Sequence, residues 1–545
     1  NIADYSPLGT YSYNQDAQYG AELDIEFTIP AQTVVTLSHT NAEVAVGLPH
    51  QRKVVRDADG YWYVAYMDDV GSGWEVFLVK STNTDGTAWA TPVKLAGSSG
   101  IIYNTTYDFY GPAIEIDRTN NVLHLVFVRS GTAGSQYLCY SKCLDLANWN
   151  QASSWYRVNG TTNGYDSVAT DAYALATNGS HWPSIAVDST GGAHILYMRT
   201  SSRYPSSYHQ LGTVWSAVLQ LTTHTVTKAY PAIVVDSNDI VHAFWSQQNS
   251  GIYTQVLHRQ NEPPYYDPGW DTTASAKITT TGNDLIYVSA AADDQGNVQV
   301  LCENDGLSQI WGAIYDGSAW TEMEGIDTLG WDKPMVGVKL GCNVIDDIIL
   351  SPSDGADPDA VSYWKWNGLF WDQPETDTGE TSDSYISLER QAPASATDMG
   401  YLIFDSSAGK LKFARIMGLT AGSESCGGAG GGGYDTTYTF DDQPTADADW
   451  DWIVLDDGNE ATPISGSDVL YSNGGTARAW NWDENATSSS RGPASGQGGN
   501  PDGYVYTEAS SPTQVDDHFI MTLSQSVDAS QYALTVSFYR CMNNY

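Results

Sequence analysis

The chain has 545 residues, of which 65 are acidic and 24 are basic, and its formal net charge is −41. Coulomb repulsion by this charge excludes nucleic acids and anionic lipid surfaces as natural partners. The sequence holds no run of about 18 apolar residues, so it predicts no membrane-spanning helix. A chain of this length has room for one large domain and one smaller domain.

Polar turns that end in a tryptophan recur along the first two thirds of the sequence. The copies occupy residues 85–89, 145–149, 316–320 and 367–371. An Asp-Gly or Asn-Gly pair supplies the positive φ angles of a tight hairpin turn. The tryptophan that follows is large enough to fill the wedge between neighbouring sheets. Recurrence of such a unit predicts a radially repeated fold.

A second repeat consists of an apolar run, an Asp-rich turn and another apolar run, and it is clearest at residues 111–127, 182–197 and 230–245. Each copy predicts a pair of antiparallel strands. No segment shows a sustained helical stripe of apolar residues, so the fold class is all-β. Together the two repeats predict a seven-bladed β-propeller with four-stranded blades at about 46–97, 102–158, 165–225, 228–282, 284–325, 330–375 and 385–417. Six or eight blades are the alternatives, because the repeats are weak in the sixth and seventh units.

The seventh unit contains only three recognisable strands. We expect residues 33–37 to supply its fourth, outer strand beside residues 411–416. Joining the two ends of the chain in one sheet closes the ring and protects edges that would otherwise be exposed. Residues 1–45 are therefore an N-terminal segment that includes the ring-closing strand, and residues 46–418 are the propeller.

A glycine-rich linker at residues 419–433 separates the propeller from residues 434–545. The second segment resembles the first part of a MAM-type jelly roll, chiefly through the run Gly-Tyr-Val-Tyr-Thr-Glu-Ala-Ser at residues 503–510. The resemblance implies an incomplete β-sandwich, so the polypeptide is expected to continue in a larger protein. Within the propeller, residues 81–89 resemble a degenerate Asp-box (BNR repeat) of the sialidase superfamily, which implies a structural turn and not an activity.

Abundant Gly, Ser, Thr, Asn and Tyr, with few lysines, predict a secreted or cell-surface protein. Asp441 and Asp517 adjoin apolar strands of the C-terminal segment, and they are the expected ligands of a structural calcium ion. Acidic side chains of solvated turns are the alternative interpretation of both residues.

The third predicted unit carries the clearest candidate site. Arg199, Arg203 and His209 fall within eleven residues of a chain that is otherwise strongly acidic. Arginine pairs with carboxylate and sulfate in a bidentate geometry, so the cluster favours an anionic sugar as ligand. The predicted binding residues are His181, Trp182, Arg199, Arg203, Tyr208, Arg52 and Tyr230. By contrast, His124, His194 and His242 recur at one point of the second strand and are expected to pack between blades.

Two functional hypotheses follow. The first is a non-catalytic surface or adhesive protein that binds a polysaccharide or a cell-surface protein. The second is a secreted polysaccharide lyase, in which His or Tyr removes the proton next to a uronate carboxylate and Arg neutralises that carboxylate. The catalytic candidates under this hypothesis are His181, Arg199, Tyr204 and His209. A lyase fits better than a sialidase, because the Arg-Ile-Pro motif of sialidases is missing.

Overall fold

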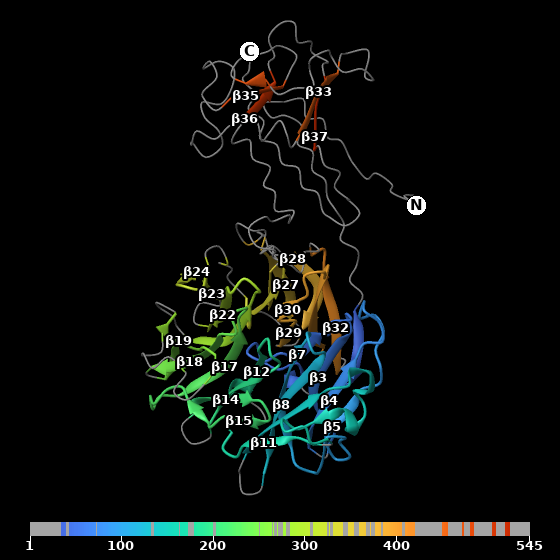
Figure 1. The fold of residues 1–545 in the computed structure, drawn as a ribbon, viewed down its shortest axis with the longest axis vertical. Helices are drawn as coiled ribbons and strands as arrows, with labels where there is room; N and C mark the ends of the chain where they lie inside the picture. The colour runs from blue at the N-terminus through green and yellow to red at the C-terminus, as the bar shows by residue number, and fades with distance from the viewer. Residues whose placement is uncertain are drawn as a thin grey trace.

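A computed structural model describes residues 34–39 and 43–419, apart from short internal gaps, and five strand segments between residues 450 and 523. The helices of the described residues are single 3-10 turns, namely η1 (Glu43–Val46), η3 (Leu146–Asn148), η4 (Ala152–Ser154) and η5 (Gly179–His181). None of them is long and apolar enough to cross a membrane. The protein is all-β, and seven sheets of the described residues form a seven-bladed β-propeller (Figure 1).

The first three blades are antiparallel sheets that run from the channel outward. Blade 1 contains β2 (Val54–Arg56), β3 (Trp62–Asp69), β4 (Trp74–Lys80) and β5 (Val93–Gly97), with β6 (Tyr103–Asn104) parallel to β5. Blade 2 contains β7 (Phe109–Asp117), β8 (Val122–Ser130), β9 (Gln136–Cys143), β10 (Trp155–Tyr156) and β11 (Asp166–Ala169). Blade 3 contains β12 (Ser184–Val187), β13 (Ala193–Met198), β14 (Pro205–Leu211), β15 (Val214–Trp215) and β16 (Leu219–Gln220).

The next three blades repeat this order. Blade 4 contains β17 (Lys228–Val235), β18 (Val241–Asn249), β19 (Ile252–Asn261) and β20 (Ala276–Lys277). Blade 5 contains β21 (Leu285–Ala292), β22 (Val298–Asn304), β23 (Gln309–Tyr315) and β24 (Trp320–Glu322). Blade 6 contains β25 (Met335–Lys339), β26 (Ile348–Pro352), β27 (Asp359–Lys365) and β28 (Thr376–Ser382), with β30 (Gln391–Ala392) parallel to β25.

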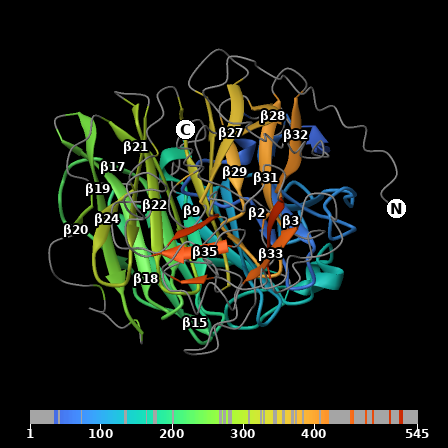
Figure 2. The ribbon, with the colours of Figure 1, turned by 90° about the horizontal axis from the view of Figure 1, so that it is seen from above.

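Blade 7 joins the two ends of the propeller. Its strands are β29 (Ile386–Leu388), β31 (Asp398–Asp405), β32 (Lys410–Met417) and β1 (Val35–His39). Strand β1 pairs antiparallel with β32, with Val35 opposite Phe413. In Figure 2 the orange strands β31 and β32 of blade 7 lie beside β2 and β3 of blade 1, so the ring closes where its last blade meets its first. The predicted ring closure is confirmed, with the strand two residues further along than expected.

One blade boundary differs from the sequence prediction. Residues from 165 onward were expected to open the third blade, but Asp166 and Ser167 pair with Tyr140 and Cys139 of β9. Strand β11 therefore completes the outer edge of blade 2. Its four residues, Asp-Ser-Val-Ala, do not reveal which neighbour it joins, because so short a segment has no pattern that distinguishes an outer strand from an inner strand.

The Asp-rich turns owe their recurrence to one side-chain geometry. The Asp188 carboxylate accepts hydrogen bonds from the backbone N–H groups of Thr190 (2.9 Å) and Gly192 (2.8 Å). The equivalent acids of blades 1, 4 and 5 make the same pair of bonds, namely Asp57, Asp236 and Asp293. Each carboxylate satisfies two donors of its turn, so part of the large negative charge is structural.

Two of the turns that end in tryptophan, at residues 85–89 and 316–320, act as hairpins and as wedges, as predicted. The second copy instead forms the 3-10 turn η3, and residues 367–370 of the fourth lie outside the described residues. Gly86 has φ +64°, and the indole N–H of Trp89 donates to its carbonyl at 2.7 Å. The Trp89 ring lies 4.9 Å from the ring of Phe413 in blade 7. Trp320 of blade 5 packs in the same way against Phe244 of blade 4, at 5.7 Å. These turns thus hold neighbouring blades together.

The repeated histidines of the second strands are buried between blades, as expected. His124 bonds to the Tyr140 hydroxyl at 2.8 Å, and His194 and His242 bond to the turn acids Asp188 (2.8 Å) and Asp236 (3.3 Å). All three side chains are at most 1% exposed. Their role is therefore structural.

In the C-terminal segment the structure describes five strands in two small sheets. They are β33 (Trp450–Leu455), β34 (Tyr471–Ser472), β35 (Trp480–Asp483), β36 (Tyr504–Thr507) and β37 (His518–Leu523). Strand β33 pairs with β37, and β35 pairs with β34 and β36. The jelly-roll assignment and the limits of the linker stay predictions.

Candidate functional site

The connection after β13 places the predicted arginines of blade 3 in one turn. The Arg199 N–H donates to the Tyr204 carbonyl (3.1 Å), and the Arg203 N–H donates to the Arg199 carbonyl (2.9 Å). Arg203 has φ +51°, a left-handed conformation that costs a non-glycine residue free energy. This tight turn brings Arg199, Arg203 and Tyr204 together, as the sequence predicts.

Asp171 orients the Arg199 side chain. The guanidinium Nη2 lies 2.5 Å from Asp171 Oδ2, and both side chains are about one third exposed, at 33% and 34%. Burial lowers the pKa of Arg199, but the hydrogen bond and charge of Asp171 outweigh it, and the pKa is raised above its ordinary value. The Tyr197 hydroxyl donates to the other Asp171 oxygen at 3.2 Å, and the Tyr208 ring stacks on Tyr197 at 5.8 Å.

Lys228 at the start of β17 extends the same group of residues into blade 4. Its ammonium lies 4.5 Å from the centroid of the Tyr204 ring and donates to the His224 carbonyl. Lys228 is 0% exposed, and this burial lowers its pKa to about 8, so Lys228 acts on a ligand through its charge and not by direct contact. We call the resulting group the rim cluster; it comprises Arg199, Arg203, Tyr204, Tyr208, Lys228 and Asp171. The cluster contains three cations and one carboxylate, so its own net charge is positive in a strongly acidic protein.

His181 lies next to the rim cluster but is 3% exposed. Burial, and then repulsion by Arg203, lower its pKa to about 3. The imidazole is therefore neutral at physiological pH. Because a general base works best when its pKa lies near the operating pH, such a histidine is a weak base for removing a proton from a sugar.

The expectation that His209 joins this site is wrong. Successive residues of a strand point to opposite faces, so Tyr208 faces Tyr197 while His209 points the other way. There its Nδ1 lies 2.6 Å from His194 Nδ1, and the wholly buried ring also contacts Asn261 Nδ2 at 3.2 Å. His209 packs between blades 3 and 4, and its pKa is well below the ordinary value because of that burial.

Trp182 and Arg52 are not surface contacts either. Trp182 is 0% exposed and fills the space beside Gly111, where an added Cβ would lie 2.4 Å from the indole. Arg52 is 1% exposed and bonds to backbone carbonyls inside the central channel. Sequence reasoning identified both residues as ligand contacts because it cannot show which large polar or aromatic side chains the ring encloses.

Tyr230 belongs to an aromatic cluster at the channel mouth. It is 8% exposed and its ring lies edge-on to those of His50 (6.0 Å), Tyr253 (5.8 Å) and Tyr287 (5.1 Å). Burial raises the pKa of Tyr230 well above its ordinary value. This burial and these ring contacts give Tyr230 a packing role.

The same mouth contains two charged residues that the sequence prediction did not include. Glu303 accepts a hydrogen bond from the Lys333 backbone N–H at 3.0 Å, and burial raises its pKa to about 8. The Lys333 ammonium lies 5.4 Å from the Tyr287 ring and 5.5 Å from the Tyr385 ring. The sequence feature that could have identified Lys333 is the pair Lys333-Pro334. It matches Trp182-Pro183 and Tyr230-Pro231, which precede or begin the inner strands of other blades.

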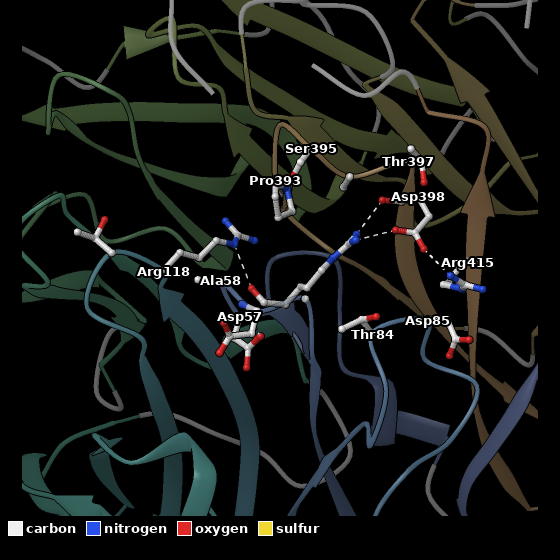
Figure 3. Close-up of a pocket in the computed structure, with 15 residues that line it drawn as sticks. Asp57, Ala58, Thr84, Asp85, Arg118, Pro393, Ser395, Thr397, Asp398 and Arg415 are labelled. Atoms are coloured by element: carbon white, nitrogen blue, oxygen red, sulfur yellow. Dashed lines mark hydrogen bonds and ion pairs between the residues drawn. The ribbon is translucent and has the colours of Figure 1, made fainter. Parts of the chain in front are cut away.

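A cavity of ≈ 550 Å³ lies on the opposite face, among the Asp-rich turns of blades 1, 2 and 7 (Figure 3). Its lining includes three arginines and four aspartates, which are Arg56, Arg118, Arg415, Asp57, Asp59, Asp85 and Asp398. This balance gives the cavity no preference for an anionic ligand.

The arginines of this cavity already have carboxylate partners. Arg56 contacts Glu389 at 2.8 Å and Asp398 at 2.6 Å, and Figure 3 shows Asp398 held from its other side by Arg415, at 2.6 Å. Glu389 also lies 3.6 Å from Arg118 of blade 2. Glu389 and Asp398 outweigh the effect of burial and raise the pKa of Arg56. We call this group the clasp, because it joins blades 1, 2 and 7 where the ring closes.

No metal-binding group is found among the residues that the structure describes. Asp441 and Asp517 lie outside these residues, so the calcium site stays a prediction.

No protein-family model matches the chain, and no curated protein matches it in sequence. Similar solved structures include an ulvan lyase of polysaccharide lyase family PL25 bound to -[GlcA(1-4)Rha3S]-, with 11% identity over 72% of this chain and 96% of the other and a TM-score of 0.44. A Hadza microbial sialidase has 11% identity over 67% and 65% of the two chains and a TM-score of 0.37. An α-L-arabinanase of Penicillium chrysogenum has 12% identity over 65% and 100%, and a TM-score of 0.41.

Proposed function

We propose that the protein is an extracellular propeller that binds an acidic glycan through the rim cluster. The observation that carries this proposal is the excess of cations in the rim cluster as defined from the described residues: Arg199, which pairs with Asp171, is joined by Arg203 in the same turn and by Lys228, whose ammonium lies over the Tyr204 ring. Arg199 is partly exposed and held in one orientation, so it can add a second carboxylate or a sulfate to its contacts. Half-buried Tyr204 and Tyr208 offer ring faces beside these charges.

The burial of His209 and the low pKa of His181 favour binding without turnover over lyase chemistry. His209 is buried on the other side of its strand, and His181 has a pKa of about 3. Of the expected bases, Tyr204 is the one that lies half-exposed next to the arginines. The lyase alternative therefore depends on Tyr204, with Arg199 as the group that neutralises the uronate. The adhesive role, the MAM-like domain and its calcium ion belong to the same proposal.

Replacing Arg199 by alanine should weaken the binding of a uronate-containing polysaccharide by about 1.5–3 kcal/mol, or about 10- to 150-fold in Kd. The reason is the loss of a charge-assisted hydrogen bond. Isothermal titration with alginate, pectin, ulvan and glycosaminoglycans, and with neutral dextran as the unbound reference, measures the effect.

Arg157→Ala is the matched control, because Arg157 is an exposed arginine on an outer turn of blade 2. Equal affinities of the Arg199 and Arg157 variants would contradict the assignment of the ligand to the rim cluster. Ultraviolet absorbance from unsaturated uronate products, if it appears with the wild type and is lost in Tyr204→Phe, would replace the binding proposal by the lyase alternative.

Glycan binding should also weaken as the pH rises through about 8, the pKa of Lys228. Below this pH the amine is charged and attracts an anionic ligand, and above it that attraction is lost. We expect an affinity about two- to fivefold lower at pH 9 than at pH 6.5, at constant ionic strength. Lys228→Arg should remove this dependence, because arginine keeps its charge over the whole interval.

Glu303 has a pKa of about 8 as well, and its ionisation would also disfavour an anionic ligand. Glu303→Gln is therefore the control. A pH dependence that disappears in Glu303→Gln and persists in Lys228→Arg would contradict the role of Lys228.

A further inference from the structure

The central channel is closed by consecutive side chains that lead into the first blade. The His50 ring bonds to the Trp182 carbonyl at 3.1 Å, and Gln51 donates to the carbonyls of Gly111 (2.8 Å) and Pro183 (3.0 Å). Lys53 donates to the Pro112 carbonyl. These side chains extend from blade 1 to the inner edges of blades 2 and 3, so the channel is filled by polar groups and not by an apolar core.

Arg52 reaches across the ring to the opposite blades. Its Nη2 donates to Ser289 Oγ (3.2 Å) and the Ala290 carbonyl (2.8 Å) of β21, and to the Val336 carbonyl (2.8 Å) of β25. Its Nε and Nη1 atoms are buried and have no hydrogen-bond partner within the described chain. A guanidinium group keeps its proton in proteins, so these are charged donors that lack acceptors.

A second arginine crosses the channel next to the first. Arg390 Nη1 donates to Glu115 Oε2 (2.8 Å) and to the Ile185 carbonyl (3.0 Å), while its Nε is buried and has no partner in the described residues. The two arginines are close enough to repel each other, and this repulsion adds to burial in lowering the pKa of Arg52. Within the described residues, Glu115 is the carboxylate that forms an ion pair with either guanidinium.

The contacts with β21 and β25 place the Arg52 guanidinium about two residues from the level at which Arg390 and Gln391 meet the same strands. Arg52 contacts the carbonyls of Ala290 and Val336, whereas the next layer contacts the same strands at Ala292, through Gln391, and at Val338, through the Arg390 carbonyl. Two residues of a strand span roughly 6–7 Å, so the main chain at Arg390 lies one such step along the channel from the Arg52 guanidinium.

We propose that a small monovalent anion of the chloride type occupies the channel between Arg52 and Arg390. It would accept hydrogen bonds from Nε and Nη1 of Arg52 and from Nε of Arg390. Burying a charge without a counter-charge is costly, and the two arginines have one carboxylate between them. A water molecule can satisfy the donors but does not supply the missing negative charge.

Crystals of the full chain grown in bromide test the site directly. We expect an anomalous bromide peak within hydrogen-bond distance of Arg52 Nε or Nη1 and Arg390 Nε. An ordered water at this position that shows no bromide signal would overturn the proposal.

Thermal unfolding provides a second test in solution. At constant ionic strength, the Tm should rise by about 1–3 °C as chloride replaces gluconate, because an anion bound only to the folded state stabilises it. Arg52→Gln should abolish this rise, and the exposed Arg157→Gln control should retain it. A wild-type Tm that does not depend on the anion would overturn the proposal, even if Arg52→Gln fails to fold.

Discussion

Replacing Leu37 by aspartate should lower the free energy of unfolding of the whole propeller by about 3–5 kcal/mol. Leu37 is 7% exposed and belongs to the core shared by blades 1 and 7, where it packs with Leu411 and Phe413. Strand β1 is the outer strand of blade 7, where the ring closes. A buried charge in this strand should therefore destabilise the whole propeller and not only detach the N-terminal strand. Denaturant unfolding followed by tryptophan fluorescence measures the loss.

Thr36→Asp is the matched control, because Thr36 is the neighbouring residue of β1 and its side chain is exposed. It introduces the same charge into the same strand without entering the core, and we expect a change within about 0.5 kcal/mol. Equal destabilisation by the two variants, or a Leu37→Asp protein as stable as the wild type, would contradict the role of β1 in closing the ring.

Replacing Arg56 by methionine should cost about 3–5 kcal/mol of unfolding free energy, since it leaves buried carboxylates without their main counter-charge. Arg56 and Glu389 are both buried, and they contact each other at 2.8 Å. The double variant Arg56→Met/Glu389→Leu should recover part of this loss, because both members of the pair are then apolar. Urea denaturation of the wild type and of each single and double variant provides the free-energy cycle.

Lys412→Met serves as the comparison. Lys412 and Asp405 form an ion pair of 2.9 Å in the same blade, but both side chains are 22% exposed. A pair in contact with solvent contributes about 0–1 kcal/mol. If Arg56→Met proved no more destabilising than Lys412→Met, the clasp would not hold the ring together as proposed.

Much of the fold could be predicted because its signals are local. Asp188 bonds to N–H groups two and four residues ahead, and Gly86 adopts a positive φ within its own turn. Such signals depend on residues that are adjacent in the sequence, so they repeat with each blade. The missing strand of blade 7 could be inferred by counting strands, because the seventh unit showed three where the other units were expected to have four. The assignment of β11 to blade 2 could not, because its pairing with β9 is not encoded in its own pattern.

The candidate site was predicted only in part. Arg199, Arg203, Tyr204 and Tyr208 come together because one turn and two adjacent strands carry them. His209 is the next residue after Tyr208, and yet it lies between blades. Lys228 completes the cluster from the neighbouring blade, and no spacing in the sequence connects it to Tyr204.

By itself the sequence determined the all-β class, the seven-fold repetition, the hairpin turns and the joining of the chain ends, since each depends on backbone geometry within a few residues. Only the tertiary structure decided which cations are available to a ligand. Arg56 is neutralised by Glu389, which lies 333 positions away in the chain, and Arg52 is enclosed by carbonyls of blades 5 and 6. Arg199 is paired but still partly exposed. In the sequence all three look alike, as arginines beside apolar strands. They differ in how deeply they are buried and in whether a distant residue compensates their charge, and both properties arise only once the ring has closed.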